Sequence, residues 1–154
     1  MLSFPEYGDH GGRVKLVRNA FDNRSYSEAN LRSLQRSPTY LADLDLVVVD
    51  AQGEAVAYCM GWIEEDDPRS GCIEPMGTHT AHRRKGFAMA LAKECFKRLR
   101  DLGVETVSIA SNGEPDVANC LYESLHPVGI RRAYRYTLDL SEARGDLPAD
   151  TDHG

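Results

Sequence analysis

The 154-residue sequence predicts an α/β fold: a mixed, mostly antiparallel sheet with one parallel strand pair, flanked by about four helices. Two short apolar segments joined by turn-forming residues indicate an antiparallel hairpin. A long helical pattern between two later strands indicates a crossover connection, which makes those two strands parallel neighbours. The acidic residues 141–154 have too little apolar content to pack. We therefore expect one domain over residues 1–140 and a disordered acidic tail.

The first part of the chain predicts two helices. Residues 1–10 show little periodicity, and we expect them to be loose. Apolar side chains then recur at three- and four-residue spacing, which predicts a short amphipathic helix over residues 13–21. Ser25 or Ser27 can cap a second helix. That helix should end before Pro38, because the residue that precedes a proline disfavours the helical conformation.

The central part predicts three strands. Residues 44–49 are rich in β-branched side chains, and the turn-forming residues 50–53 connect them to a returning strand over residues 54–63. A third strand follows over residues 72–78. No convincing strand precedes Val14, so we expect residues 44–49 to lie at an unprotected sheet edge. Such an edge would favour a homodimer, or a second domain of the same kind in a longer parent chain.

The last part alternates helices and strands. Four apolar side chains spaced by four residues predict a long helix with one buried face: Phe87, Leu91, Cys95 and Leu99. Gly103 ends this helix, and residues 104–110 predict a buried strand. A further helix over residues 115–125 is closed by Pro127. Residues 128–140 predict a last strand or hairpin.

Composition and charge exclude several classes of protein. The net charge of −6 argues against a nucleic-acid partner, which normally meets a basic face. The sequence has no apolar run of roughly 18 or more residues, so no membrane span is expected. The N-terminus lacks the basic-then-apolar order of a secretory signal, and we expect a cytoplasmic protein. The four cysteines form no Cys-x-x-Cys pair, and we interpret them as reduced core residues: Cys59, Cys72, Cys95 and Cys120.

A basic, glycine-containing turn precedes the long helix and predicts an anion site. Its sequence is Arg83-Arg84-Lys85-Gly86-Phe87-Ala88. The first N–H groups of a helix lack partners and lie at the positive end of its dipole. Gly86 and Ala88 leave room for a pyrophosphate near the backbone, and the three cations add donors. The alternative, a plain basic surface run, would oppose the helix dipole. The sequence contains neither G-x-G-x-x-G nor a P-loop motif.

Two motifs in this order resemble those of the GNAT superfamily of N-acetyltransferases. Arg83-x-x-Gly86-x-Ala88 matches the family's [Q/R]-x-x-G-x-[G/A] motif, and the sequence Leu-Tyr-Glu-Ser-Leu at residues 121–125 resembles its LYExLGF signature. Residues 73–79 resemble the strand that leads to the first motif. The resemblance covers roughly residues 25–137. It implies a GNAT domain that transfers an acetyl group from acetyl-CoA to an amine.

The resemblance also implies where acetyl-CoA would lie. Its site would be formed where the fourth and fifth strands splay apart. Backbone groups near Met76, Gly77 and Thr78 would bind the pantetheine arm in the manner of an added strand. The amides of residues 84–88 would hold the pyrophosphate, and Asn119 is a further candidate contact with CoA. The chain departs from the usual family pattern at Thr80, at Pro115 and at His126-Pro127.

Two residues are candidates for proton transfer. Tyr122 matches the family tyrosine near the thioester sulfur, where a phenol could protonate the leaving thiolate because its pKa of about 10 lies close to that of a thiol. The alternative is a tyrosine that only packs in the core. Glu74 is the candidate base, and we expect it to face the same side of its strand as Cys72 and Met76. A surface carboxylate is the alternative for Glu74, with a water molecule taking the proton.

The predicted activity is therefore direct attack of a small-molecule or peptide amine on acetyl-CoA. A covalent cysteine intermediate is less favoured, since no cysteine has a His–Asp arrangement next to it in the sequence. His79-x-x-His82 has the spacing of a metal pair, but no further ligands accompany it, so we expect solvated loop histidines and no metal. The rival interpretation is a catalytically silent CoA-binding sensor or regulatory domain.

Overall fold

The computed structural model describes residues 1–111, 117–131 and 137. Its strands are β1 (Leu2–Ser3), β2 (Asp45–Val49), β3 (Ala55–Ile63), β4 (Ser70–Thr78) and β5 (Thr106–Ser108). Its α-helices are α1 (Phe4–Tyr7), α2 (His10–Phe21), α3 (Glu28–Gln35), α4 (Phe87–Asp101) and α5 (Val117–Glu123). Two short 3-10 helices are η1 (Ala42–Leu44) and η2 (Thr80–His82).

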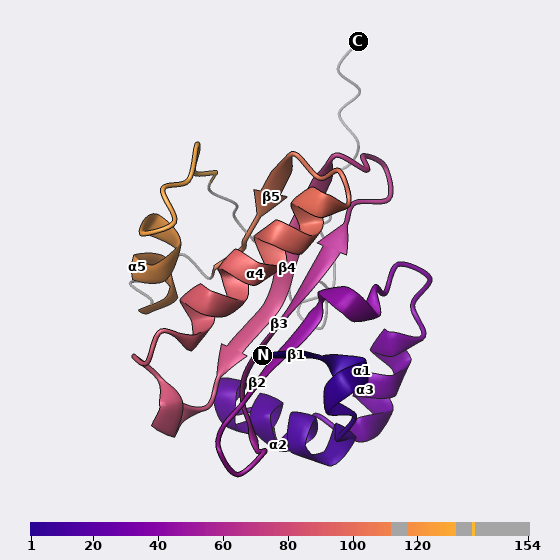
Figure 1. Cartoon of the computed structure of the whole chain (residues 1–154), viewed down its shortest axis with the longest axis vertical. Coiled ribbons are helices and arrows are strands. Elements are labelled where there is room, and N and C mark those ends of the chain that lie inside the picture. Colours follow the sequence, from indigo (N-terminus) through magenta and orange to yellow (C-terminus); the bar gives the residue numbers. More distant parts are fainter. Residues whose placement is uncertain (112–116, 132–136, 138–154) are drawn as a thin grey trace, which may run out of the picture.

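The strands form one sheet in the order β1-β2-β3-β4-β5 (Figure 1). The pairs from β1 to β4 are antiparallel, and β4 and β5 are parallel. Helix α4 supplies the crossover between the two parallel strands and lies across one face of the sheet (Figure 1). The predicted fold class, a mixed sheet with one parallel pair flanked by helices, is thereby confirmed.

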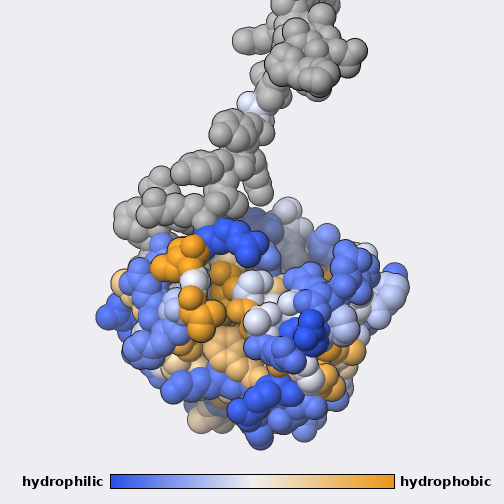
Figure 2. All heavy atoms as spheres, turned by 90° about the horizontal axis from the view of Figure 1, so that it is seen from above, coloured by the Kyte–Doolittle hydropathy of each residue, from blue (hydrophilic) through white to orange (hydrophobic). Residues whose placement is uncertain are grey.

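Both faces of the sheet are buried, because successive side chains of β2 and β3 alternate between two apolar clusters. On one face Leu46 and Cys59 pack with residues of α4, namely Leu91, Cys95 and Leu99. On the other face Val47 and Tyr58 pack with residues of α2 and α3, namely Leu16, Val17 and Leu31. Figure 2 shows that apolar side chains gather in one hollowed area at the top of the molecule and that polar side chains surround it.

The N-terminal residues are ordered, and the expectation that residues 1–10 are loose is wrong. Leu2 and Ser3 pair with β2, where Leu2 lies opposite Val47. The Ser3 backbone N–H donates to Glu6 Oε2 at 2.7 Å and starts α1 through a capping box. The β2 edge is therefore covered by a short strand, which is a common protection against edge pairing. The homodimer or partner domain stays a prediction, but the exposed β2 edge on which it was based is absent from the described residues.

The helix bounds differ from the predicted ones by a few residues, for local reasons. Helix α2 begins at His10 because the Asp9 side chain accepts the Gly12 backbone N–H at 3.0 Å. Helix α3 is capped by Ser27 rather than Ser25, and Asn30 completes its capping box. Helix α4 and its buried face agree with the prediction, and Gly103 follows its end with a φ of 93°.

The C-terminal part agrees less well with the prediction. Strand β5 covers Thr106–Ser108 rather than residues 104–110, since β4 pairs with it only at its first residues. The prediction of a buried strand is also wrong, because Thr106 and Ser108 are exposed and Val107 is half-buried. Helix α5 covers Val117–Glu123. Residues 128–131 and 137 form no strand, and the other residues of the predicted last strand lie outside the described residues, as does the predicted tail 141–154. No helix among the described residues is long and apolar enough to span a membrane.

The cysteines are free thiols that occupy different environments. Cys59 and Cys95 are buried and Cys72 is half-buried, as expected of small core residues. Cys120 is exposed on α5, so its interpretation as a core residue is wrong.

Candidate active site

Strands β4 and β5 part after three paired positions. Ser70, Gly71 and Cys72 pair with Thr106, Val107 and Ser108. Strand β4 then continues from Ile73 to Thr78 with only β3 as a partner among the described strands. The edge of β4 on the β5 side therefore leaves backbone N–H and C=O groups for a ligand that binds in extended form. Met76, Gly77 and Thr78, predicted to contact the pantetheine arm, lie on this length of β4.

The phosphate turn, defined here as Arg83–Gly86, connects η2 to α4. Arg84 has a φ of 63° and Gly86 a φ of 82°, so two of its residues take the left-handed conformation. Gly86 is the N-cap of α4, and no side chain caps the helix there. A Cβ atom built at Gly86 would meet no heavy atom within 4 Å, so the space in front of the helix is open. The turn thus presents the N-terminal amides of α4 to that space.

The cations of the turn have different surroundings. The Arg84 and Lys85 side chains are exposed and make no ion pair with any described residue. Arg83 instead donates to two backbone carbonyl oxygens, to Ala20 at 3.0 Å and to Thr78 at 3.4 Å. Phe87 and Ala88 begin α4 and are half-buried, and Phe87 packs against the cluster under that helix. Arg84 and Lys85 are therefore the side chains of the turn that are available to form an ion pair with a phosphate group.

The end of α2 holds the loop before the phosphate turn in place. The Thr80 backbone N–H donates to Asn19 Oδ1 at 2.7 Å, a bond that a proline at this position could not make. Gly77 lets α2 lie close to β4, because a Cβ atom there would come within 2.9 Å of the Phe21 ring and 3.1 Å of Ala20 Cβ. No local sequence pattern indicates this role of Asn19, since its partner lies 61 residues away.

Glu74 lies on β4 at a bulge that changes the predicted facing of its neighbours. Cys59 pairs with Met76 and Gly61 with Ile73, so Glu74 and Pro75 together oppose a single residue of β3. Met76 packs against the cluster under α4, whereas Cys72 pairs with Trp62, which packs on the opposite face. The expectation that Cys72 and Met76 share one side is therefore wrong, because the extra residue shifts the alternation.

Glu74 itself is exposed, and its carbonyl oxygen accepts the Trp62 indole N–H at 2.6 Å. Trp62 was not singled out in the sequence, although it is the only tryptophan.

Burial and the carboxylates of Glu64 and Glu74 raise the pKa of the Cys72 thiol to about 11. Cys72 is therefore a protonated thiol near neutral pH and a poor nucleophile.

The two histidines near the turn contact each other. The rings of His79 and His82 are 5.6 Å apart in an edge-to-face arrangement, and His79 Nδ1 accepts the Ala81 backbone N–H at 3.2 Å. The described residues contain no group of three or more His, Cys, Asp or Glu side chains that could hold a metal ion. These contacts give both histidines a local structural role in η2.

Helix α5 carries the remaining candidates, Asn119 and Tyr122. Both side chains are half-buried. The Tyr122 carbonyl oxygen accepts the Leu125 backbone N–H at 3.1 Å, which forms a turn directly after the end of the helix. Their roles toward CoA stay predictions.

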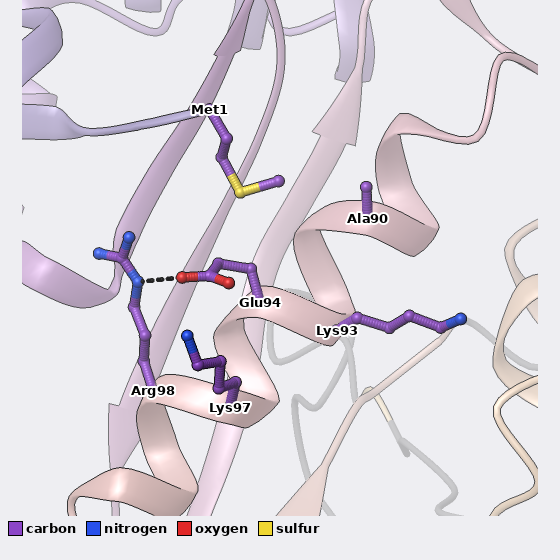
Figure 3. Close-up of a pocket in the computed structure, with 6 residues that line it drawn as sticks. All are labelled: Met1, Ala90, Lys93, Glu94, Lys97 and Arg98. Carbon is purple, nitrogen blue, oxygen red and sulfur yellow. Dashed lines mark hydrogen bonds and ion pairs between the residues drawn. The ribbon is translucent and has the colours of Figure 1, made fainter.

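A pocket of about 560 Å³ lies elsewhere on the surface, along α4 (Figure 3). Its lining residues are Met1, Ala90, Lys93, Glu94, Lys97 and Arg98. Glu94 and Arg98 pair across one helical turn at 2.8 Å, and Arg98 also donates to the Asp43 carbonyl oxygen at 2.7 Å. No lining residue comes from β4, the phosphate turn or α5, so we do not assign this pocket to the active site.

The comparisons with known proteins agree with this geometry. The family model described as the acetyltransferase (GNAT) family matches residues 16–126. The match spans most of the chain, and the protein therefore belongs to the GNAT acetyltransferase family. Among curated protein sequences, none matches the chain.

Several solved structures share the fold. An aminoglycoside acetyltransferase, meta-AAC0020, from an uncultured soil metagenomic sample and in complex with sisomicin, has a TM-score of 0.70 at 16% identity, with 90% of this chain and 93% of that chain covered. The ribosomal-protein-S18-alanine N-acetyltransferase from Escherichia coli has a TM-score of 0.62 at 20% identity, with 77% and 70% covered. A ribosomal-protein-alanine N-acetyltransferase from Brucella melitensis biovar Abortus 2308 has a TM-score of 0.68 at 16% identity, with 86% and 95% covered.

Proposed function

We propose that this protein is an N-acetyltransferase that transfers the acetyl group of acetyl-CoA to an amine by direct attack. One observation carries the proposal. Strand β4 leaves β5 after Cys72, and its unpaired edge leads through η2 into the uncapped start of α4. An extended amide-bearing arm fits along such an edge, and a pyrophosphate fits at a helix N-terminus.

The residues present fit this cosubstrate. Backbone groups of Met76, Gly77 and Thr78 would bind the pantetheine arm, and the amides of residues 84–88 would bind the pyrophosphate. Open space in front of Gly86 supports this assignment. Arg84 and Lys85 would add charge, and Asn119 would be a further contact. When bound, acetyl-CoA supplies the activated acetyl thioester.

Proton transfer would be divided between two residues. Glu74 would take the proton of the attacking amine, directly or through a water molecule, since it is an exposed carboxylate beside the splay. Tyr122 would donate a proton to the departing thiolate, a role that rests on its motif match. No covalent enzyme intermediate is needed, which agrees with the raised pKa of Cys72.

The acceptor would be a small-molecule or peptide amine. The net charge of −6 favours a cationic acceptor over an anionic one. Structural neighbours described as an aminoglycoside acetyltransferase and as a ribosomal-protein-S18-alanine N-acetyltransferase suggest both kinds of amine as first trials. A homodimer or an accompanying second GNAT domain would be compatible with this activity.

A turnover assay with a binding measurement tests the proposal. Thiol release from acetyl-CoA would be followed with sisomicin, an alanine-initiated peptide and spermidine, and the Kd of acetyl-CoA would be measured by calorimetry. We expect amine-dependent thiol release and the mass of an acetylated product. Tight binding without turnover on a broader amine panel would instead identify a CoA-binding sensor. A protein that binds no acetyl-CoA would contradict both functions.

A further inference from the structure

The candidate base is held by the only tryptophan of the chain. Trp62 lies opposite Cys72 in the β3–β4 register, and its side chain reaches along the strand to Glu74. Diagonal neighbours across an antiparallel pair lie within reach of an aromatic side chain. The bond from Trp62 Nε1 to the Glu74 carbonyl oxygen measures 2.6 Å, a short distance for an N–H donor.

This bond falls at the place where the backbone ladder is interrupted. Glu74 and Pro75 form the bulge on β4, and Pro75 has no N–H to donate. A bulge leaves backbone groups without a ladder partner and redirects the side chains beside it. The indole of Trp62 supplies a donor for the Glu74 carbonyl group at that point. The tryptophan therefore fixes the backbone from which the Glu74 carboxylate extends.

Trp62 is in turn held from the interior. Its ring contacts the Tyr40 ring edge-to-face, with 6.4 Å between centroids. The Tyr40 hydroxyl donates to Asp45 Oδ2 at 3.1 Å, and Asp45 is paired with Arg13 at 3.1 Å in the core. A continuous series of contacts thus connects a buried ion pair to the bulge that carries the candidate base.

We infer that Trp62 is a positioning residue, which sets the direction of the Glu74 carboxylate through its bond to the Glu74 carbonyl oxygen. This inference rests on the proposed function, because it gives Glu74 the role of base. Trp62 takes no proton and contacts no reacting atom. Its contribution is to hold the carboxylate within reach of the attacking amine, where a small misplacement lowers the rate strongly.

A double-mutant cycle tests the inference. Trp62→Phe keeps an aromatic ring beside Tyr40 and removes the N–H donor. With saturating acetyl-CoA and the best amine of the panel, we expect kcat to fall about tenfold and the Kd of acetyl-CoA to change less than about twofold. In the Glu74→Gln background, the same substitution should change kcat less than about twofold, because the residue that it positions no longer acts as a base.

Replacement of Trp62 by benzothienylalanine separates the loss of the N–H donor from a folding defect. This residue has the size of tryptophan and carries sulfur in place of the N–H group, and it can be introduced uniquely because the chain has one tryptophan. It should reproduce the loss of kcat in a fully folded protein. A wild-type kcat in this variant, or an equal loss in both Glu74 backgrounds, would overturn the inference alone. A wild-type protein that acetylates no amine would overturn the proposed function and the inference with it.

Discussion

Arg83 donates through its guanidinium to the carbonyl oxygen of Ala20 at 3.0 Å, and so ties the phosphate turn to the end of α2. The Ala20 carbonyl is among the last of its helix and lacks an intrahelical partner, so a cation is favoured there. The same side chain reaches the Thr78 carbonyl oxygen at the end of β4. The arginine of the motif thus joins the turn to two elements, α2 and β4. We therefore expect backbone amides, rather than this guanidinium, to meet the pyrophosphate.

The first prediction concerns Gly86. Gly86→Val should weaken acetyl-CoA binding at least roughly tenfold, because a branched side chain would occupy the open space through which we propose that the pyrophosphate reaches the backbone. Calorimetric titration of acetyl-CoA into the folded variant measures the effect.

Backbone strain needs a separate control, because a valine is strained at the φ of 82° that Gly86 adopts. Gly53 has the same φ of 82° in the β2–β3 turn and also has no neighbour within 4 Å of a built Cβ atom. Gly53→Val should therefore lose similar stability and keep the affinity for acetyl-CoA. Equal affinities for acetyl-CoA in the wild type, Gly86→Val and Gly53→Val would contradict the assignment of a phosphate site to this turn.

The second prediction concerns Glu74. Glu74→Gln should lower kcat roughly 10²-fold and remove the rise of the rate with pH on the acidic side, because an amide cannot accept the amine proton. The measurement is a pH–rate profile at saturating acetyl-CoA. Glu65→Gln, in the exposed loop before β4, is a matched control that should keep the wild-type profile. An unchanged profile in Glu74→Gln would assign the proton to water or to another group.

Local sequence signals predicted the elements whose determinants lie within one segment. The β-branched residues 44–49 and the turn residues 50–53 predicted the β2–β3 hairpin, and the four-residue spacing from Phe87 to Leu99 predicted the buried face of α4. Strand β1 has only two residues, too few for a period, and its partner Val47 lies far along the chain. The Ser3-x-x-Glu6 capping box was a signal that could have located α1.

The sequence motif identified the residues of the candidate site, but it did not predict which way their side chains face or what they contact. The turn residues follow one another in the sequence, so a local pattern identifies them. The face of the sheet on which Met76 lies depends on the bulge in β4. The one signal for that bulge in the sequence was a proline within a predicted strand. The partners of Arg83 and Trp62 are set by tertiary packing, which no local pattern encodes.

The third prediction concerns Tyr122. Tyr122→Phe keeps the ring and removes the hydroxyl group that would protonate the thiolate. We expect kcat to fall by roughly 10²-fold or more while the Kd of acetyl-CoA stays nearly unchanged, since the loss affects proton transfer and not binding. Steady-state kinetics with parallel calorimetry separates the two quantities. Full activity would show that this tyrosine only packs in α5.

The fourth prediction concerns Cys72, the cysteine nearest to Glu74 along β4. With a pKa of about 11, its thiol should react slowly with iodoacetamide at pH 7.5, and the rate should rise about tenfold per pH unit until the pH approaches 11. Peptide mass spectrometry follows the reaction, with the exposed Cys120 as an internal comparison. Cys72→Ser should keep kcat within about twofold. A loss of about 10²-fold would instead support a covalent cysteine intermediate.

The fifth prediction concerns the ion pair of Arg13 and Asp45, whose side chains are 1% and 0% exposed. Arg13 Cζ lies 3.3 Å from the centroid of the Tyr58 ring, and the Nε and Nη1 atoms of Arg13 have no hydrogen-bond partner among the described residues. Burial raises the pKa of the Asp45 carboxyl group, and Arg13 opposes that rise. Asp45 is thus the counter-charge on which the buried guanidinium depends.

Asp45→Asn should therefore destabilise the fold by about 3 kcal/mol or more, because it leaves a buried cation without its counter-charge while the shape of the side chain is kept. Urea unfolding measures the change, and Asp43→Asn, at an exposed neighbouring position, should stay within about 0.5 kcal/mol of wild type. The double variant Arg13→Met with Asp45→Asn should recover part of the loss, since it removes the uncompensated charge. If Asp45→Asn alone is neutral, the Tyr58 ring is enough to stabilise the buried guanidinium, and the series of contacts from the core to Trp62 does not depend on charge.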